Sequence, residues 1–225
     1  MKYEIIGGQL PAVSCILDKG EKIFTESGGM SWMDDAFSME SNTRGGLLKG
    51  IGRAFSGDSI FLTTYECLKD NSNIVFGSCF PGKILPMTLA SGEELILQKS
   101  AFLAGTNEME IKAHLNKKIG AGFFGGEGFI LQKLIGPGTA FLEIDGDVVE
   151  KTLAPGEKIK VDQGYLAAFE PNVEYSVETV KGVKNVLFSG EGLFIATLTG
   201  PGKVWLQTMP FNVIANRIVS LVPTK

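Results

Sequence analysis

The sequence predicts an all-β fold of three tandem pseudo-repeats, built from short antiparallel strands in a pseudo-threefold arrangement, with a short C-terminal helix. The first observation is a five-residue word that occurs three times, at residues 55–59 (FSGDS), 124–128 (FGGEG) and 188–192 (FSGEG). The second is a Gly-Glu word that recurs in step with it, at residues 20–25, 92–97 and 156–161. The third is the glycine content, 29 of 225 residues, spread between apolar runs as the tight turns of a β protein require.

The repeats are expected near residues 8–70, 80–135 and 144–208 of a single domain, 1–225, with a tail at 210–225. A unit of this size with only short strands does not easily bury a core alone. We therefore expect the three units to pack side by side, which also protects the edges of their sheets.

Apolar runs bounded by glycine predict the strands within each repeat. Three such runs follow the five-residue word directly, at residues 60–64, 129–134 and 193–198. Two Gly-Pro-Gly sequences, at 136–138 and 200–202, predict the turns into the next strands at 141–144 and 204–207.

Two later segments show a clear periodicity. Residues 174–180 alternate polar and apolar side chains, which predicts a half-buried strand. Four apolar side chains of the tail follow at helical spacing, and Pro210 suits a first turn: Phe211, Ile214, Ile218 and Leu221. A short helix is expected, although the β-branched residues Val213, Ile218 and Val219 also suit a strand. Docking of this stripe on the chain's own β body is favoured over a partner or membrane surface, because the tail carries only two cations, Arg217 and Lys225.

Charge and cysteine usage narrow the classes of function. The formal net charge is −4 and no Lys/Arg stripe is present, which argues against nucleic acid as a partner. The three cysteines have no paired spacing and are interpreted as buried, reduced thiols of a cytoplasmic protein. Neither a secretory leader nor a membrane span is predicted, because no apolar run is long enough.

Several words together resemble a known family. Residues 187–194 (LFSGEGLF), residues 198–207 (LTGPGKVWLQ), and residues 28–33 (GGMSWM) followed by Gly45-Gly46 are similar to the altered-inheritance-of-mitochondria protein twenty-four family, also called the mitochondrial biogenesis family. The resemblance covers nearly the whole chain. It implies units like the tryptophan RNA-binding attenuation protein, a short double-stranded β-helix. It implies no activity, cofactor or catalytic residue.

Residue patterns typical of catalysis are weak in this sequence. Double-stranded β-helix enzymes bind metals through clustered histidines, whereas this chain has one histidine, His114, so no metal or cofactor is predicted. Asp34, Asp35 and Glu40 are interpreted as solvated acids of one polar loop, although a hard cation is an alternative. Residues 120–125 match G-x-G-x-x-G, but a strand follows instead of a helix, which favours a turn.

Two sets of residues are candidates for binding. Asp58, Glu127 and Glu191 occupy the same place in the triplicated word, so they either converge near the pseudo-threefold axis or cap backbone N–H groups of their own turns. Trp32 and Arg44 belong to residues 28–55, a glycine-rich segment with three methionines that forms either a binding loop or part of the packed repeat.

The leading functional hypothesis is a non-enzymatic scaffold or binding protein that self-associates and presents loops of a triplicated β body to a protein or small ligand. One alternative is a carboxylate-based small-molecule sensor or enzyme. The other is RNA binding by analogy with the attenuation protein, which the acidic balance disfavours.

Overall fold

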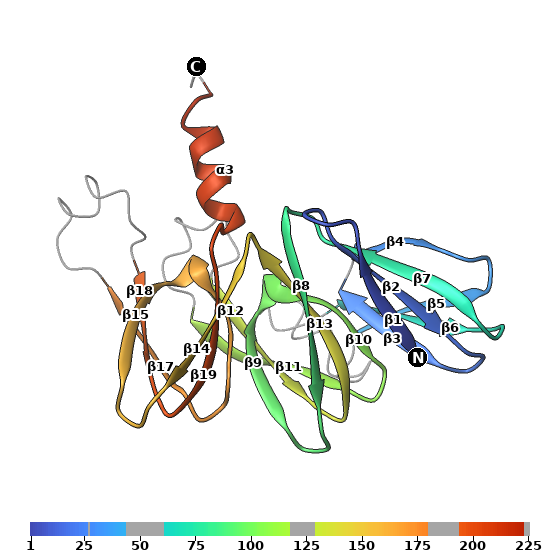
Figure 1. The fold of residues 1–225 in the computed structure, drawn as a ribbon, viewed down its shortest axis with the longest axis horizontal. Helices are drawn as coiled ribbons and strands as arrows, with labels where there is room; N and C mark the ends of the chain where they lie inside the picture. Colours follow the sequence, from blue (N-terminus) through green and yellow to red (C-terminus); the bar gives the residue numbers. More distant parts are fainter. Residues whose placement is uncertain (27, 44–60, 118–128, 180–193, 223–225) are drawn as a thin grey trace. The chain divides into compact units, whose positions relative to one another are not determined.

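The structure is a computed structural model that describes residues 1–26, 28–43, 61–117, 129–179 and 194–222. These residues form antiparallel sheets and a short C-terminal helix, which confirms the predicted all-β class (Figure 1). The chain divides into two compact units, Met1–Glu143 and Ile144–Lys225. The boundary falls at the start expected for the third repeat, although the division into repeats stays a prediction.

The first unit consists almost entirely of strands. In chain order it begins with β1 (Lys2–Ile6), β2 (Ala12–Leu17), β3 (Lys22–Glu26), β4 (Met30–Met33), β5 (Phe37–Thr43), β6 (Phe61–Cys67) and β7 (Ser72–Gly77). It continues with β8 (Gly82–Leu89), β9 (Glu94–Gln98), the 3-10 turn η1 (Lys99–Ala101), β10 (Phe102–Thr106), β11 (Glu110–Lys117), β12 (Phe129–Ile135) and β13 (Gly138–Asp145), whose last two residues enter the second unit.

The second unit contains the remaining elements. They are β14 (Val148–Leu153), β15 (Lys158–Asp162), the 3-10 turn η2 (Gln163–Tyr165), β16 (Leu166–Phe169), β17 (Glu174–Thr179), β18 (Phe194–Thr199), β19 (Gly202–Gln207) and the helix α3 (Phe211–Val219). The strands expected after the five-residue word are β6, β12 and β18, so that expectation is confirmed. The expected C-terminal helix is also confirmed, as α3.

The strands pair in the same order three times. Within the first unit the orders β2-β7-β4 and β5-β6-β3 are followed by β10-β13-β8 and β11-β12-β9. Within the second unit the corresponding orders are β14-β19-β16 and β15-β18-β17. Each group of six strands therefore forms two three-stranded parts, with β7, β13 or β19 at the centre of one part and β6, β12 or β18 at the centre of the other. This recurrence supports a triplicated chain.

Alternating burial explains why these segments are strands. In β17, Tyr175 and Val177 are half-buried while Glu174 and Ser176 are exposed, as the alternation of residues 174–180 predicts. The first unit has a core of buried apolar side chains from its central strands, among them Val13, Leu17, Ile23, Ile74, Phe76 and Phe141. Aromatic rings from different strands meet in this core, such as Tyr65 and Phe76 with centroids 6.1 Å apart.

The cysteines are only partly as expected. Cys15 and Cys67 are fully buried, and burial raises the pKa of the Cys15 thiol to about 12. Cys79 is exposed, so the interpretation of all three as buried thiols is wrong at this position. Cys79 lies in the turn between β7 and β8, where the nearby Glu143 carboxylate accepts its backbone N–H at 2.7 Å.

Candidate functional site

Most of the predicted binding residues lie outside the described part of the chain. These are Asp58, Glu127, Glu191 and Arg44. Trp32 is described and lies on β4, opposite Val75 of β7, where its side chain is 55% exposed. Trp32 is therefore available at the surface of the first unit, and the structure gives no test of the other four residues.

The second recurring word, which contains Gly-Glu, forms the same turn three times. In each copy a glycine with positive φ precedes the glutamate: Gly20 at +88°, Gly92 at +80° and Gly156 at +78°. The glutamate side chain then accepts the backbone N–H of the residue three positions before it. Glu21 accepts from Asp18 (2.8 Å), Glu93 from Ala90 (2.7 Å) and Glu157 from Ala154 (2.8 Å).

The same turn is tied to the neighbouring strand by two backbone hydrogen bonds. In the second unit, Gly156 N–H donates to Gly200 O (3.0 Å) and Gly200 N–H donates to Glu157 O (2.9 Å). The corresponding pair at the second copy of the word joins Gly92, Glu93 and Gly136, with distances of 3.4 and 2.9 Å. At the first copy, Gly20 and Glu21 form these bonds with Cys67, at 2.8 and 2.9 Å. The recurring glutamates thus hold turns closed.

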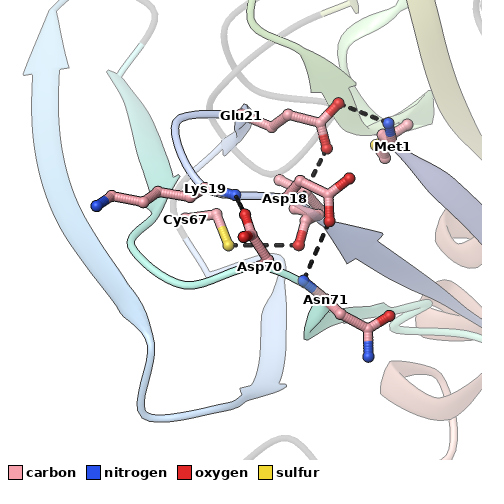
Figure 2. Close-up of polar contacts among 8 residues, drawn as sticks. Met1, Asp18, Lys19, Glu21, Cys67, Asp70 and Asn71 are labelled. Atoms are coloured by element: carbon pink, nitrogen blue, oxygen red, sulfur yellow. Dashed lines mark hydrogen bonds and ion pairs between the residues drawn. The ribbon is translucent and has the colours of Figure 1, made fainter.

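The first of these turns carries a larger polar cluster, which Figure 2 shows. The Glu21 carboxylate accepts a hydrogen bond from the N-terminal ammonium of Met1 at 2.6 Å, in addition to the one from the Asp18 N–H. Burial acts to raise the pKa of Glu21, but the hydrogen bonds from Met1 and Asp18 outweigh it and hold this pKa below its ordinary value. The carboxylate is therefore kept ionised and directed at the turn.

Two further acids of this cluster bind backbone groups. Asp70 accepts the Lys19 N–H at 2.9 Å, and Asp18 accepts the Asn71 N–H at 3.2 Å (Figure 2). Asn71 has a positive φ of 56°, a conformation that asparagine tolerates better than most residues. The buried Cys67 thiol donates to Lys69 O at 3.0 Å and lies 3.5 Å from Leu17 O. This cluster joins the β2–β3 turn to the β6–β7 turn.

The acids considered for a hard cation, Asp34, Asp35 and Glu40, do not form one group in the structure. Asp34 accepts the Asn73 N–H at 2.7 Å and donates its own N–H to Asn73 O, which ties β4 to the start of β7. Glu40 lies in β5, so the three acids are not in one loop as expected. Over the described ranges no group of three or more His, Cys, Asp and Glu side chains is arranged to hold a metal ion.

His114 lies on β11. Burial lowers its pKa, the Lys133 ammonium lowers it further, and Glu94 opposes this effect. Lys133 and Glu94 form an ion pair at 2.7 Å on the adjacent strands β12 and β9. A neutral imidazole is therefore favoured beside a charged pair.

A group of strongly exposed apolar side chains lies at the C-terminal end of the described residues. We use the name α3 apolar face for five of them, which are between 58% and 79% exposed: Phe211, Ile218, Val219, Leu221 and Val222. Three of these residues, Phe211, Ile218 and Leu221, belong to the stripe expected to pack on the β body, and that expectation is wrong for them. Ile214, the fourth residue of the stripe, is half-buried. The helical spacing predicted which residues share a face, but no signal in the sequence predicted that the face is uncovered.

The start of α3 is held by the body of the second unit. The Phe211 N–H donates to the Asp145 carboxylate at 2.7 Å, and the Asn212 side chain lies against Gly164 of η2. Burial raises the pKa of Asp145, and the hydrogen bond from Phe211 counteracts part of this rise. The backbone of the first turn is therefore anchored, whereas the side chain of Phe211 and the apolar side chains at residues 218–222 are exposed. No helix in the part of the chain that the structure describes is long and apolar enough to cross a bilayer.

Comparisons with known proteins agree with this fold. The family model described as mitochondrial biogenesis AIM24 matches residues 3–209, which ends just before α3. An uncharacterized protein of Streptococcus pyogenes serotype M6, M6_Spy0233, is 26% identical over 225 residues, covering 96% of this chain and 88% of that protein. The crystal structure of protein SPYM3_0169 from Streptococcus pyogenes is similar with a TM-score of 0.81 and 23% identity, covering 98% of this chain and 99% of that one.

Proposed function

We propose that this chain, which belongs to the mitochondrial biogenesis AIM24 family, is a non-enzymatic scaffold. In this role it holds a protein partner at an exposed apolar surface. The observation that carries the proposal is the α3 apolar face. Contiguous apolar patches on monomeric proteins are rarely larger than a few hundred Å², and larger ones typically mark interaction sites. Five large apolar side chains on one short segment are a patch of this kind.

The environment of the recurring acids supports a scaffold over an enzyme. Catalytic carboxylates usually need a perturbed pKa and an open side towards the substrate. Glu21, Glu93 and Glu157 instead accept N–H groups of their own turns at 2.7–2.8 Å. By analogy we propose the same folding role for Asp58, Glu127 and Glu191, each of which lies within a glycine-containing word.

The three tandem repeats and their attenuation-protein-like shape belong to the same proposal. The recurring strand orders and the recurring Gly-Glu turns support a triplicated body. Such a body is suited to hold a helix or loop at a fixed position, because each of its Gly-Glu turns is closed by hydrogen bonds of backbone groups.

The experiment is affinity capture with the full chain, followed by quantification of the proteins that are recovered in stoichiometric amounts. We compare the wild type with Ile218→Lys, which places a charge on the α3 apolar face, and with Ser220→Lys, which places the same charge at an exposed polar residue just after the end of α3. The proposal predicts that a partner, either a second copy or a different protein, is recovered with wild type and Ser220→Lys and lost with Ile218→Lys. Recovery of no stoichiometric partner, or turnover of a small molecule that Glu191→Gln abolishes, would contradict it.

A further inference from the structure

We propose that the partner at the α3 apolar face is a second copy of this chain, so that two α3 helices pack face to face across a twofold axis. The inference rests on the proposed function and names its partner. In a twofold contact the same residues of both copies meet, so a uniformly apolar face is complementary to itself. The α3 apolar face has this property, because all five of its residues are apolar.

The area of the face reaches at most the lower limit for such a contact. Covering a fully exposed side chain of this kind buries roughly 100 Å², so five of them on each of two copies, which are 58–79% exposed, bury no more than about 1,000 Å². Specific interfaces begin near about 1,000 Å² in total, and contacts of this size are often weak or transient. Ile214 and Ala215, which are half-buried, lie on the same side of the helix and extend the contact.

The charge distribution distinguishes a second copy from a lipid surface. A helix that lies on a membrane needs several Lys and Arg residues on its polar face to bind anionic headgroups. Within α3 only Arg217 is charged, and the chain has a net charge of −4, which opposes binding to an anionic surface. Pairing of two copies requires no cations, because the five side chains of the face are uncharged.

The length of α3 gives a second reason for pairing. Nine residues are too few for a helix to be stable by propensity alone. Its first backbone N–H is held by Asp145, but four of the five side chains of the face lie further on, at residues 218–222. Packing against a second helix would supply the tertiary contacts that most short helices in proteins depend on.

The test is the molar mass of the full chain in solution, measured by sedimentation from low micromolar to about 100 µM, a range suited to weak interfaces. Wild type and Ser220→Lys should shift from the mass of one chain towards that of two as concentration rises. Ile218→Lys should raise the dissociation constant at least about tenfold, because a charge replaces a buried apolar group. Leu221→Lys, at a side chain that is 79% exposed, is the second variant if Ile218→Lys fails to fold.

Three results would overturn the inference. Wild type that has the mass of one chain at every concentration has no partner copy. A dimer that persists in Ile218→Lys and Leu221→Lys uses another surface. Flotation of wild type, but not Ile218→Lys, with vesicles of phosphatidylcholine and phosphatidylserine identifies a membrane as the occupant. If the mass stays that of one chain while capture of a different protein still depends on Ile218, this inference fails and the proposed function remains.

Discussion

Gly200→Ala is the sharpest test of the recurring turn. Gly200 exchanges backbone hydrogen bonds with the turn at Gly156 and Glu157, so the two backbones approach closely. A Cβ atom at residue 200 would lie 2.4 Å from Ala154 O, 2.7 Å from Leu153 O and 2.7 Å from Leu153 Cβ. The first two atoms are backbone carbonyls at the end of β14, so they cannot move aside as the end of a flexible side chain can.

The expected loss is at the upper end of what overpacking causes, about 2–3 kcal/mol of the free energy of unfolding. For a chain of this size, 1 kcal/mol lowers the melting temperature by roughly 2–4 °C, so we expect a decrease of about 4–12 °C. Circular dichroism during heating gives the melting temperature, and urea titration gives the free energy of unfolding.

Gly156→Ala is the matched control, because it changes the other glycine of the same turn. No atom lies within 4 Å of its added Cβ, but its φ of +78° is unfavourable for alanine. The cost is about 1–2 kcal/mol from the backbone, partly offset by the lower entropy of the unfolded chain, which leaves about 1 kcal/mol. A Gly200→Ala protein as stable as Gly156→Ala would refute the close approach at Gly200.

Three further predictions concern single side chains. Hydrogen bonds lower the pKa of Glu21 in the folded protein, so the carboxylate stabilises the fold above its unfolded pKa of 4.5, and this stabilisation is lost as the pH falls below that value. Glu21→Gln should therefore reduce the difference in urea midpoint between pH 7 and pH 3. A thiol reagent at pH 8 should label Cys79 fast and Cys15 only on unfolding, so Cys79→Ser should remove the fast phase. Asp145→Ala should speed amide hydrogen exchange at Phe211 and cost about 1 kcal/mol, as the loss of a helix-capping carboxylate typically does; unchanged exchange would contradict the anchoring role.

Local signals predicted much of this fold. The strands β6, β12 and β18 and the half-buried strand β17 follow from apolar runs and from a period of two, which depend only on near neighbours in the chain. The Gly-Pro-Gly sequences likewise predicted turns, and Gly138 and Gly202 have φ values of +146° and +142°. Turn chemistry is read well from sequence because it is set by two or three adjacent residues.

The candidate site was predicted less well, since its contacts join distant parts of the chain. Lys19 binds Asp70 across 51 positions, and Met1 binds Glu21 across 20. A usable signal existed for Glu21, Glu93 and Glu157, because a glutamate follows the glycine in every copy of the word. The helical spacing in α3 showed its apolar side but contained no information on what covers it, because coverage depends on tertiary packing.

The two kinds of candidate surface differ in what binding would require. A ligand that took the carboxylate of Glu93 or Glu157 would displace the hydrogen bond from the exposed N–H of Ala90 or Ala154, which contributes about 0.5–1.5 kcal/mol to the turn. A partner that covers the α3 apolar face removes apolar surface from water and breaks none of the hydrogen bonds described for the helix. Association at α3 therefore gains free energy without opposing the turns that stabilise the body, which is the physical reason to look for this protein's partner at the helix.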